Sequence, residues 1–145
     1  MSRYPFLPAL RELVRCYQAF ESFGAGHIRT LGVTPSQFDI IATLGNTQGM
    51  TFKRLGEKTL ITKGTLTGVV DRLEAKKIVQ RIASPTDGRS QIVQLTPMGE
   101  ALFAQIFPKH LDHVGKALAD VHPDELQQIQ SQLQKLRSVL KRTQS

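Results

Sequence analysis

Residues 62–77, Thr-Lys-Gly-Thr-Leu-Thr-Gly-Val-Val-Asp-Arg-Leu-Glu-Ala-Lys-Lys, decide the fold that we expect for this chain. Apolar side chains recur in this stretch at the i, i+3, i+4 and i+7 spacing of one helical stripe, at Leu66, Val69, Val70 and Leu73. The opposite face is small, hydroxylic and basic, with Gly64 and Gly68 on its central line. A helix with such a face can approach base edges in the major groove of DNA.

The segments on either side extend this helix into a larger motif. Thr51 is suited to cap a shorter preceding helix and Thr62 to cap the helix itself, with residues 59–61 between them, as in a helix-turn-helix. Residues 78–83 and 90–95 are rich in branched apolar side chains and flank turn residues at 84–88, which predicts a two-stranded hairpin. Arg89 falls near its tip, where it could reach a minor groove.

These residues carry a family resemblance. Thr65 to Glu74, followed by Asp-Gly-Arg-Ser at 87–90, Leu-Thr at 95–96 and Gly99, resembles the MarR family of winged helix-turn-helix transcriptional regulators. A looser resemblance extends over the whole chain and includes residues 33–38. It implies a cytoplasmic bacterial or archaeal homodimer, most often a repressor, that a small aromatic or lipophilic effector releases from its operator.

Composition and charge agree with a DNA-binding role. The net charge of the 145 residues is +7, and between residues 51 and 96 nine Lys or Arg face four Asp or Glu, so that +5 of the total lies there. Such a concentration of charge favours a polyanionic partner. The single cysteine excludes an intrachain disulfide, and the sequence has neither an 18-residue apolar run nor a signal-peptide pattern. We therefore expect a cytoplasmic protein without membrane contact.

The fold class that we expect is mainly α with a small two-stranded β-wing. Residues 1–33 would form an N-terminal dimerisation helix, residues 34–96 the winged helix-turn-helix lobe, and residues 97–145 C-terminal dimerisation helices. Thr-Pro at 34–35 and 96–97 and His-Pro at 122–123 are typical helix starts, and Pro108 should kink or split its helix. One recognition helix reads few base pairs, so a two-fold dimer on an inverted repeat is expected.

Roles within the expected DNA-binding surface differ. The glycines either allow close backbone approach or are merely tolerated on the surface, and Asp71 and Arg72 read as organising residues. Asp87 could orient Arg89 or pair with Arg72, while Lys53, Arg54, Lys76 and Arg81 are phosphate candidates. The candidate DNA-binding residues are Thr51, Lys53, Arg54, Thr62, Lys63, Gly64, Thr65, Thr67, Gly68, Arg72, Arg81, Asp87, Arg89 and Ser90.

Three sensing mechanisms are open. The effector pocket suggested by the resemblance would use Tyr17, Phe20, His27, Phe38 and His110. Zinc-sensing relatives suggest a metal set of Glu21, Asp39, His110 and His113, although polar residues lining a dimer cleft are the favoured interpretation. Hydroperoxide-sensing relatives use a cysteine on the first helix, but Cys16 falls about two helical turns later, and we interpret it as a small buried apolar residue.

The sequence argues against an enzyme. It contains no nucleophile elbow, P-loop, GxGxxG or His-Glu-x-x-His motif, and no cofactor is expected. We therefore predict a sequence-specific, effector-responsive regulator, most simply a repressor on an inverted-repeat operator. The alternatives are a redox-sensing or metal-sensing regulator and a non-specific nucleoid-type DNA binder.

Overall fold

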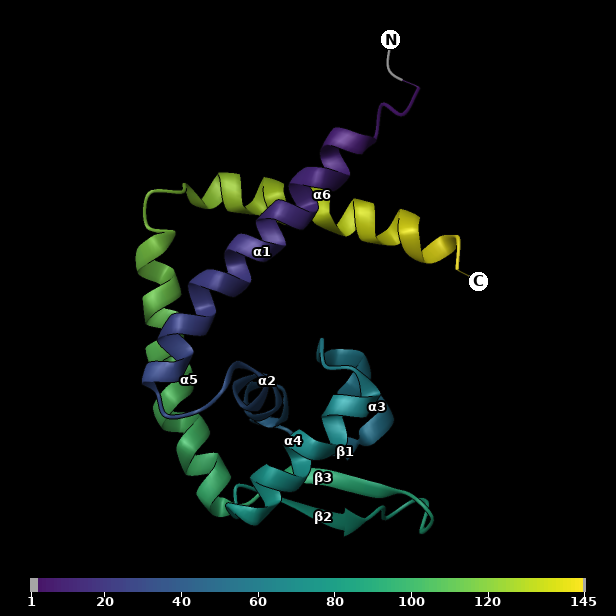
Figure 1. Cartoon of the computed structure of the whole chain (residues 1–145), viewed down its shortest axis with the longest axis vertical. Coiled ribbons are helices and arrows are strands. Elements are labelled where there is room, and N and C mark those ends of the chain that lie inside the picture. The colour runs from purple at the N-terminus through teal and green to yellow at the C-terminus, as the bar shows by residue number, and fades with distance from the viewer. Residues whose placement is uncertain (1–2, 145) are drawn as a thin grey trace. The chain divides into compact units, whose positions relative to one another are not determined.

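The computed structural model describes residues 3–144 and divides into two compact units, one up to Leu111 and one from Asp112 onward. The elements follow one another along the chain as α1 (Leu7–Thr30), α2 (Pro35–Leu44), β1 (Met50–Thr51), α3 (Phe52–Lys58), α4 (Lys63–Ala75), β2 (Val79–Ala83), β3 (Gln91–Leu95), α5 (Pro97–Ala117) and α6 (Pro123–Arg142), as Figure 1 shows. The mainly helical class and the helix-turn-helix followed by a wing are confirmed.

Helix starts follow the local sequence signals. Thr34 and Gln37 form a reciprocal capping box at the start of α2, in which each side chain accepts a hydrogen bond from the other residue's backbone N–H, at 3.1 and 3.0 Å. Thr51 caps α3 by accepting from the backbone N–H of Arg54 at 3.2 Å. Thr62 occupies the N-cap of α4, but its hydroxyl bonds to the Thr65 hydroxyl at 3.3 Å and does not cap the backbone.

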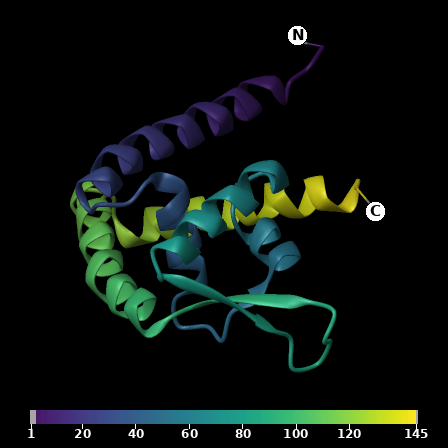
Figure 2. The same cartoon turned by 60° about the horizontal axis from the view of Figure 1, so that its bottom comes forward.

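The wing is the β2–β3 ribbon, which extends as a hairpin in Figures 1 and 2. The sequence predicted two strands, and the structure adds a third, because β1 pairs antiparallel with β3 and gives the order β1-β3-β2. Met50, Val93 and Arg81 are register partners across this sheet. The three-stranded sheet therefore anchors the wing on the segment that leads directly into α3.

The core of the first unit joins α2, α3, α4 and the sheet. Its largest fully buried side chains are Ile40, Ile41, Leu44, Leu55, Val70, Leu73, Val79 and Val93. Gly99, near the start of α5, packs against the segment that connects α4 to β2. A Cβ at this position would lie 2.1 Å from the carbonyl oxygen of Ile78. Only glycine fits there without a backbone shift, so α5 starts at a fixed place beside the wing.

The terminal helices bury few residues within the described chain. In α1 only Gly24 and Ile28 are buried, and in α6 none of the residues is buried. α5 continues through Pro108, so this proline does not split the helix, and the alternative expectation, a kink, stays a prediction. Over residues 3–144, every helix is either too short or too polar to cross a bilayer.

Candidate nucleic-acid interface

The two faces of α4 differ as the sequence predicted. Leu66, Val69, Val70 and Leu73 are buried in the core, whereas Lys63, Gly64, Thr65, Thr67 and Arg72 are exposed. A Cβ added at Gly64 or Gly68 would meet no described atom within 4 Å. Packing inside the chain therefore does not require either glycine, and the exposed face is free for a partner to approach closely.

The wing turn is built around Asp87. Its Oδ1 accepts a hydrogen bond from the backbone N–H of Arg89 at 3.0 Å, and its Oδ2 accepts from the Ser90 hydroxyl at 3.2 Å. The Ser84 hydroxyl oxygen closes the other side of the turn by accepting from the backbone N–H groups of Thr86 and Asp87. Asp87 thus fixes the main chain that presents the exposed side chain of Arg89, and the alternative pairing with Arg72 is not among the contacts between described residues.

A cavity of about 590 Å³ lies between the start of α3 and the wing. It brings the exposed cations Lys53 and Arg89 to one depression, and the residues that line it are Thr51, Phe52, Lys53, Arg81, Ile82, Ala83, Gly88, Arg89, Ser90 and Gln91. Arg54 is also exposed on α3. Several candidate DNA-binding residues that are far apart in sequence are therefore neighbours in the first unit.

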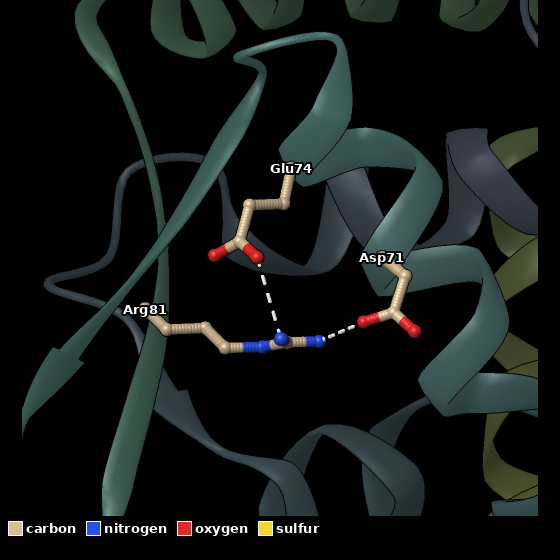
Figure 3. A network of polar contacts seen from close by, with 3 residues as sticks. All are labelled: Asp71, Glu74 and Arg81. Carbon is tan, nitrogen blue, oxygen red and sulfur yellow. Dashed lines mark hydrogen bonds and ion pairs between the residues drawn. The ribbon is translucent and has the colours of Figure 1, made fainter.

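Arg81, one of the phosphate candidates, is paired with two carboxylates of α4. Its guanidinium forms ion pairs with Asp71 through Nη2 and with Glu74 through Nη1, the second at 3.3 Å (Figure 3). Its Cζ lies 5.4 Å from the centroid of the Phe52 ring, and its side chain is only 23 % exposed. Asp71 thus contacts the wing through Arg81, and its expected role as an organising residue stays a prediction.

Three of the five expected effector-pocket residues meet. The Nδ1 atoms of His27 and His110 lie 3.0 Å apart, and the Phe38 ring contacts the His110 ring edge-on at a centroid distance of 4.9 Å. Phe20 is 61 % exposed instead, and the Tyr17 hydroxyl donates to Glu21 at 2.5 Å. This hydrogen bond raises the pKa of Tyr17 to about 12.

A second cavity, of about 290 Å³, has a different lining from the expected pocket. It is lined by Glu21, Pro35, Ser36, Asp39, Leu60, Ile61, Thr62 and Thr65. Burial raises the pKa of Asp39 there, opposed by a hydrogen bond from the backbone N–H of Leu60 at 3.4 Å. This cavity reaches Thr65 on the exposed face of α4, so an occupant would touch the recognition helix directly.

The alternative sensing residues are also placed. Within residues 3–144, no three His, Cys, Asp or Glu side chains gather in a way that could hold a metal ion, so the structure adds no support to the suggested set of Glu21, Asp39, His110 and His113. Cys16 is exposed on α1, and the expectation that it is buried is wrong for the single chain.

Comparison with known proteins identifies the family. Residues 31–90 match the MarR family. The chain is 30% identical over 124 residues, 86% of each protein, to the HTH-type transcriptional regulator MhqR of Bacillus subtilis. A probable transcriptional regulator from Pseudomonas aeruginosa is similar in structure, with 31% identity, a TM-score of 0.69 and coverage of 86% of this chain and 92% of the other.

A further solved structure is Bordetella bronchiseptica BpsR, whose DNA binding is described as regulated by 6-hydroxynicotinic acid. It is 26% identical, with a TM-score of 0.75 over 94% of this chain and 96% of the other. The match over residues 31–90 includes α4 and the turn that presents Arg89, the elements that form the candidate DNA-binding surface. This chain belongs to the MarR family of DNA-binding transcriptional regulators, which are not enzymes.

Proposed function

We propose that the protein is a sequence-specific repressor that binds an inverted-repeat operator as a homodimer in the bacterial cytoplasm. The observation that carries this proposal is the pairing, in one compact unit, of an exposed hydroxylic and basic face on α4 with an exposed arginine at the wing tip. The helix face suits the major groove, and Arg89 suits the adjacent minor groove. Direct reading of bases by both elements would give sequence specificity.

The terminal helices support the homodimer. Large apolar side chains remain exposed on the single chain, namely Leu7, Val14, Phe20 and Phe23 on α1 and Leu126, Ile129, Leu133, Val139 and Leu140 on α6. Soluble proteins seldom leave so many on adjacent helical turns unless a partner covers them. A second copy of the chain is the partner that also places two recognition helices on the two half-sites of an inverted repeat.

The cavity of about 290 Å³ supports release by an effector. It lies between α1, α2 and the first turn of α4, so a bound molecule would contact both the recognition helix and the N-terminal helix α1. A ligand shifts the recognition helix only if it binds the DNA-bound and free conformations with different affinities. The carboxylates of Glu21 and Asp39 in the lining favour a ligand that donates hydrogen bonds.

Selection of duplexes from a random library by the purified protein tests the DNA-binding part of the proposal. Repressor function predicts an enriched inverted repeat, bound far more tightly than a scrambled duplex of equal length and composition at the same salt concentration. Equal affinity for both duplexes would favour the nucleoid-type alternative. Fluorescence anisotropy against salt concentration measures the two affinities directly.

Release by an effector needs a separate experiment. Small aromatic compounds that carry hydroxyl groups are added to the preformed complex, and dissociation is followed by anisotropy. An active compound should lose its effect in Asp39→Asn, whereas Asp112→Asn, the same change at an exposed carboxylate outside the cavity, should respond normally. Equal responses of the two variants would place the effector elsewhere.

A further inference from the structure

We propose that Arg81 is a positioning residue for DNA recognition, which fastens the wing to the recognition helix and does not itself bind phosphate. This inference rests on the proposed DNA-binding function. Arg81 belongs to β2, its two ion-pair partners belong to α4, and the ring under its guanidinium belongs to the first residue of α3. One side chain thus contacts the helix expected to read the major groove, the helix before it and the wing.

The sheet register explains why Arg81 points inward. Residues paired directly across antiparallel strands place their side chains on the same face. Arg81 is paired with Val93, which is paired in turn with Met50 on its other side, and both of these apolar residues are buried. Ile82, the next residue of β2, is 38 % exposed on the other face. The guanidinium therefore leaves the sheet on the side of the core and α4, as Figure 3 shows.

Charge balance also argues against a phosphate contact. The cation is matched by two carboxylates, so the cluster of Arg81, Asp71 and Glu74 carries a formal charge of −1. The Nε atom is buried and has no hydrogen-bond partner among the described residues. A DNA phosphate that approached Arg81 would meet Asp71 and Glu74 beside it, and it would have to displace them.

The fastening has a consequence for recognition. A two-stranded ribbon is marginally stable by itself, so the direction of its tip depends on what holds its base. Arg81 holds the base of the wing against α4, and Arg89 lies at the tip of the same ribbon. The ion pairs therefore set the separation between the wing arginine and the recognition helix, which must match the spacing between adjacent grooves.

Two substitutions of opposite charge test the proposal on the selected operator. Arg81→Met removes one positive charge, and Asp71→Asn removes one negative charge by an isosteric change at an exposed position. If the ion pair positions the wing, both should weaken operator binding by about tenfold, and the double variant should bind no more weakly than the weaker single variant. A simple effect of net charge would move the two single variants in opposite directions.

The salt dependence of binding distinguishes positioning from direct contact. Loss of a phosphate contact flattens the slope of log affinity against log salt by about one unit per subunit. We expect this flattening for Lys53→Met, the matched control, because Lys53 is an exposed cation that lines the same cavity as Arg81. We expect an unchanged slope for Arg81→Met. Circular dichroism at the titration temperature verifies that each variant is folded.

Either of two results would overturn the proposal. The first is a flattened slope in Arg81→Met that equals that of Lys53→Met. The second is tighter operator binding by Asp71→Asn, which would make Asp71 a plain repulsive charge. If the unmodified protein binds selected and scrambled duplexes equally, the proposed repressor function fails instead, and this outcome is recognised before any variant is made.

Discussion

Arg89 illustrates how the wing tip separates a structural from a recognition role. Its backbone N–H bonds to Asp87, while its side chain is exposed and free of the turn's hydrogen bonds. Arg89→Ala should therefore leave the fold intact and weaken operator binding by about 1–3 kcal/mol, through loss of a minor-groove contact. Anisotropy titration measures the change, with Lys135→Ala on α6 as the control for net charge. Unaltered affinity would exclude a role for Arg89 in binding.

Substitutions of Lys63 and Thr65, two nearby residues of α4, should affect DNA binding in different ways. Lys63 begins the helix, where we expect DNA phosphates to run, so Lys63→Ala should weaken binding to all duplexes alike and flatten the salt slope by about one unit per subunit. Thr65 lies two residues further along the exposed face, so Thr65→Ala should relax the preference at one operator position. Titrations with singly substituted operators separate the two effects. An altered base preference in Lys63→Ala at the original salt slope would contradict this assignment.

The side-chain contacts of Asp87 and Arg81 differ in how far they can be predicted from the sequence. The Asp87 turn could be anticipated, because its contacts span three residues or fewer. The ion pairs of Arg81 could not, since its partners lie seven and ten residues away on another element. Strand alternation was also misleading, because Ile82 suggests the buried face of β2 more strongly than Arg81 does, yet Ile82 is 38 % exposed and the Arg81 side chain only 23 %.

At the scale of elements, local signals were sufficient for most boundaries. The capping box at Thr34, the cap at Thr51 and the Pro123 start were all readable, because each depends on residues within one helical turn. β1 was missed since its two residues become a strand only by pairing with Ile92 and Val93, some forty residues later. The cavity of about 290 Å³ was not anticipated for a similar reason, as residues 60–62 of its lining lie between helices and have no periodicity. The effector-pocket residues expected from the sequence stay a prediction.

We expect Gly68 to lower the stability of the recognition helix while allowing its backbone to approach DNA closely. Gly68→Ala should raise the free energy of unfolding by about 0.5–1 kcal/mol, because alanine has less backbone freedom to lose and no described atom obstructs its Cβ. The same methyl group should weaken operator binding, because it would stand between the helix backbone and DNA. Denaturant unfolding and anisotropy measure the two effects.

Gly115→Ala in α5 is the matched control for Gly68→Ala. Gly115 is also helical and equally unobstructed among the described atoms, so its replacement should stabilise the protein and leave DNA binding unchanged. If Gly68→Ala binds the operator as tightly as the unmodified protein, Gly68 is a tolerated surface glycine.

At the scale of the whole molecule, the apolar stripe of α6 calls for a second copy. Leu133 is 50 % exposed in the single chain. If a partner subunit covers it, Leu133→Asp buries a charge near its symmetry mate, and the dimer should dissociate or unfold at micromolar concentration. Operator binding should then fall far more than in Arg89→Ala, because the contacts of an entire half-site are lost.

Sedimentation equilibrium tests whether the dimer interface includes the apolar stripe of α6. Ser131→Asp adds the same charge two residues earlier, on the opposite side of α6, and should remain dimeric. A folded Leu133→Asp dimer that still binds DNA would show that the seam lies elsewhere. The amphipathic ends of the chain were predictable from periodicity alone, whereas the match of one subunit's stripe to another's depends on the partner's surface.

The exposed thiol of Cys16 gives this protein a built-in reporter. Since the chain has one cysteine, a maleimide dye attaches to a single known point on α1 without any substitution. If a second copy covers that part of α1, the labelling rate should fall as the protein is concentrated and recover on dilution. The half-way concentration would then give the dissociation constant of the assembly from the native chain, in the presence or absence of DNA.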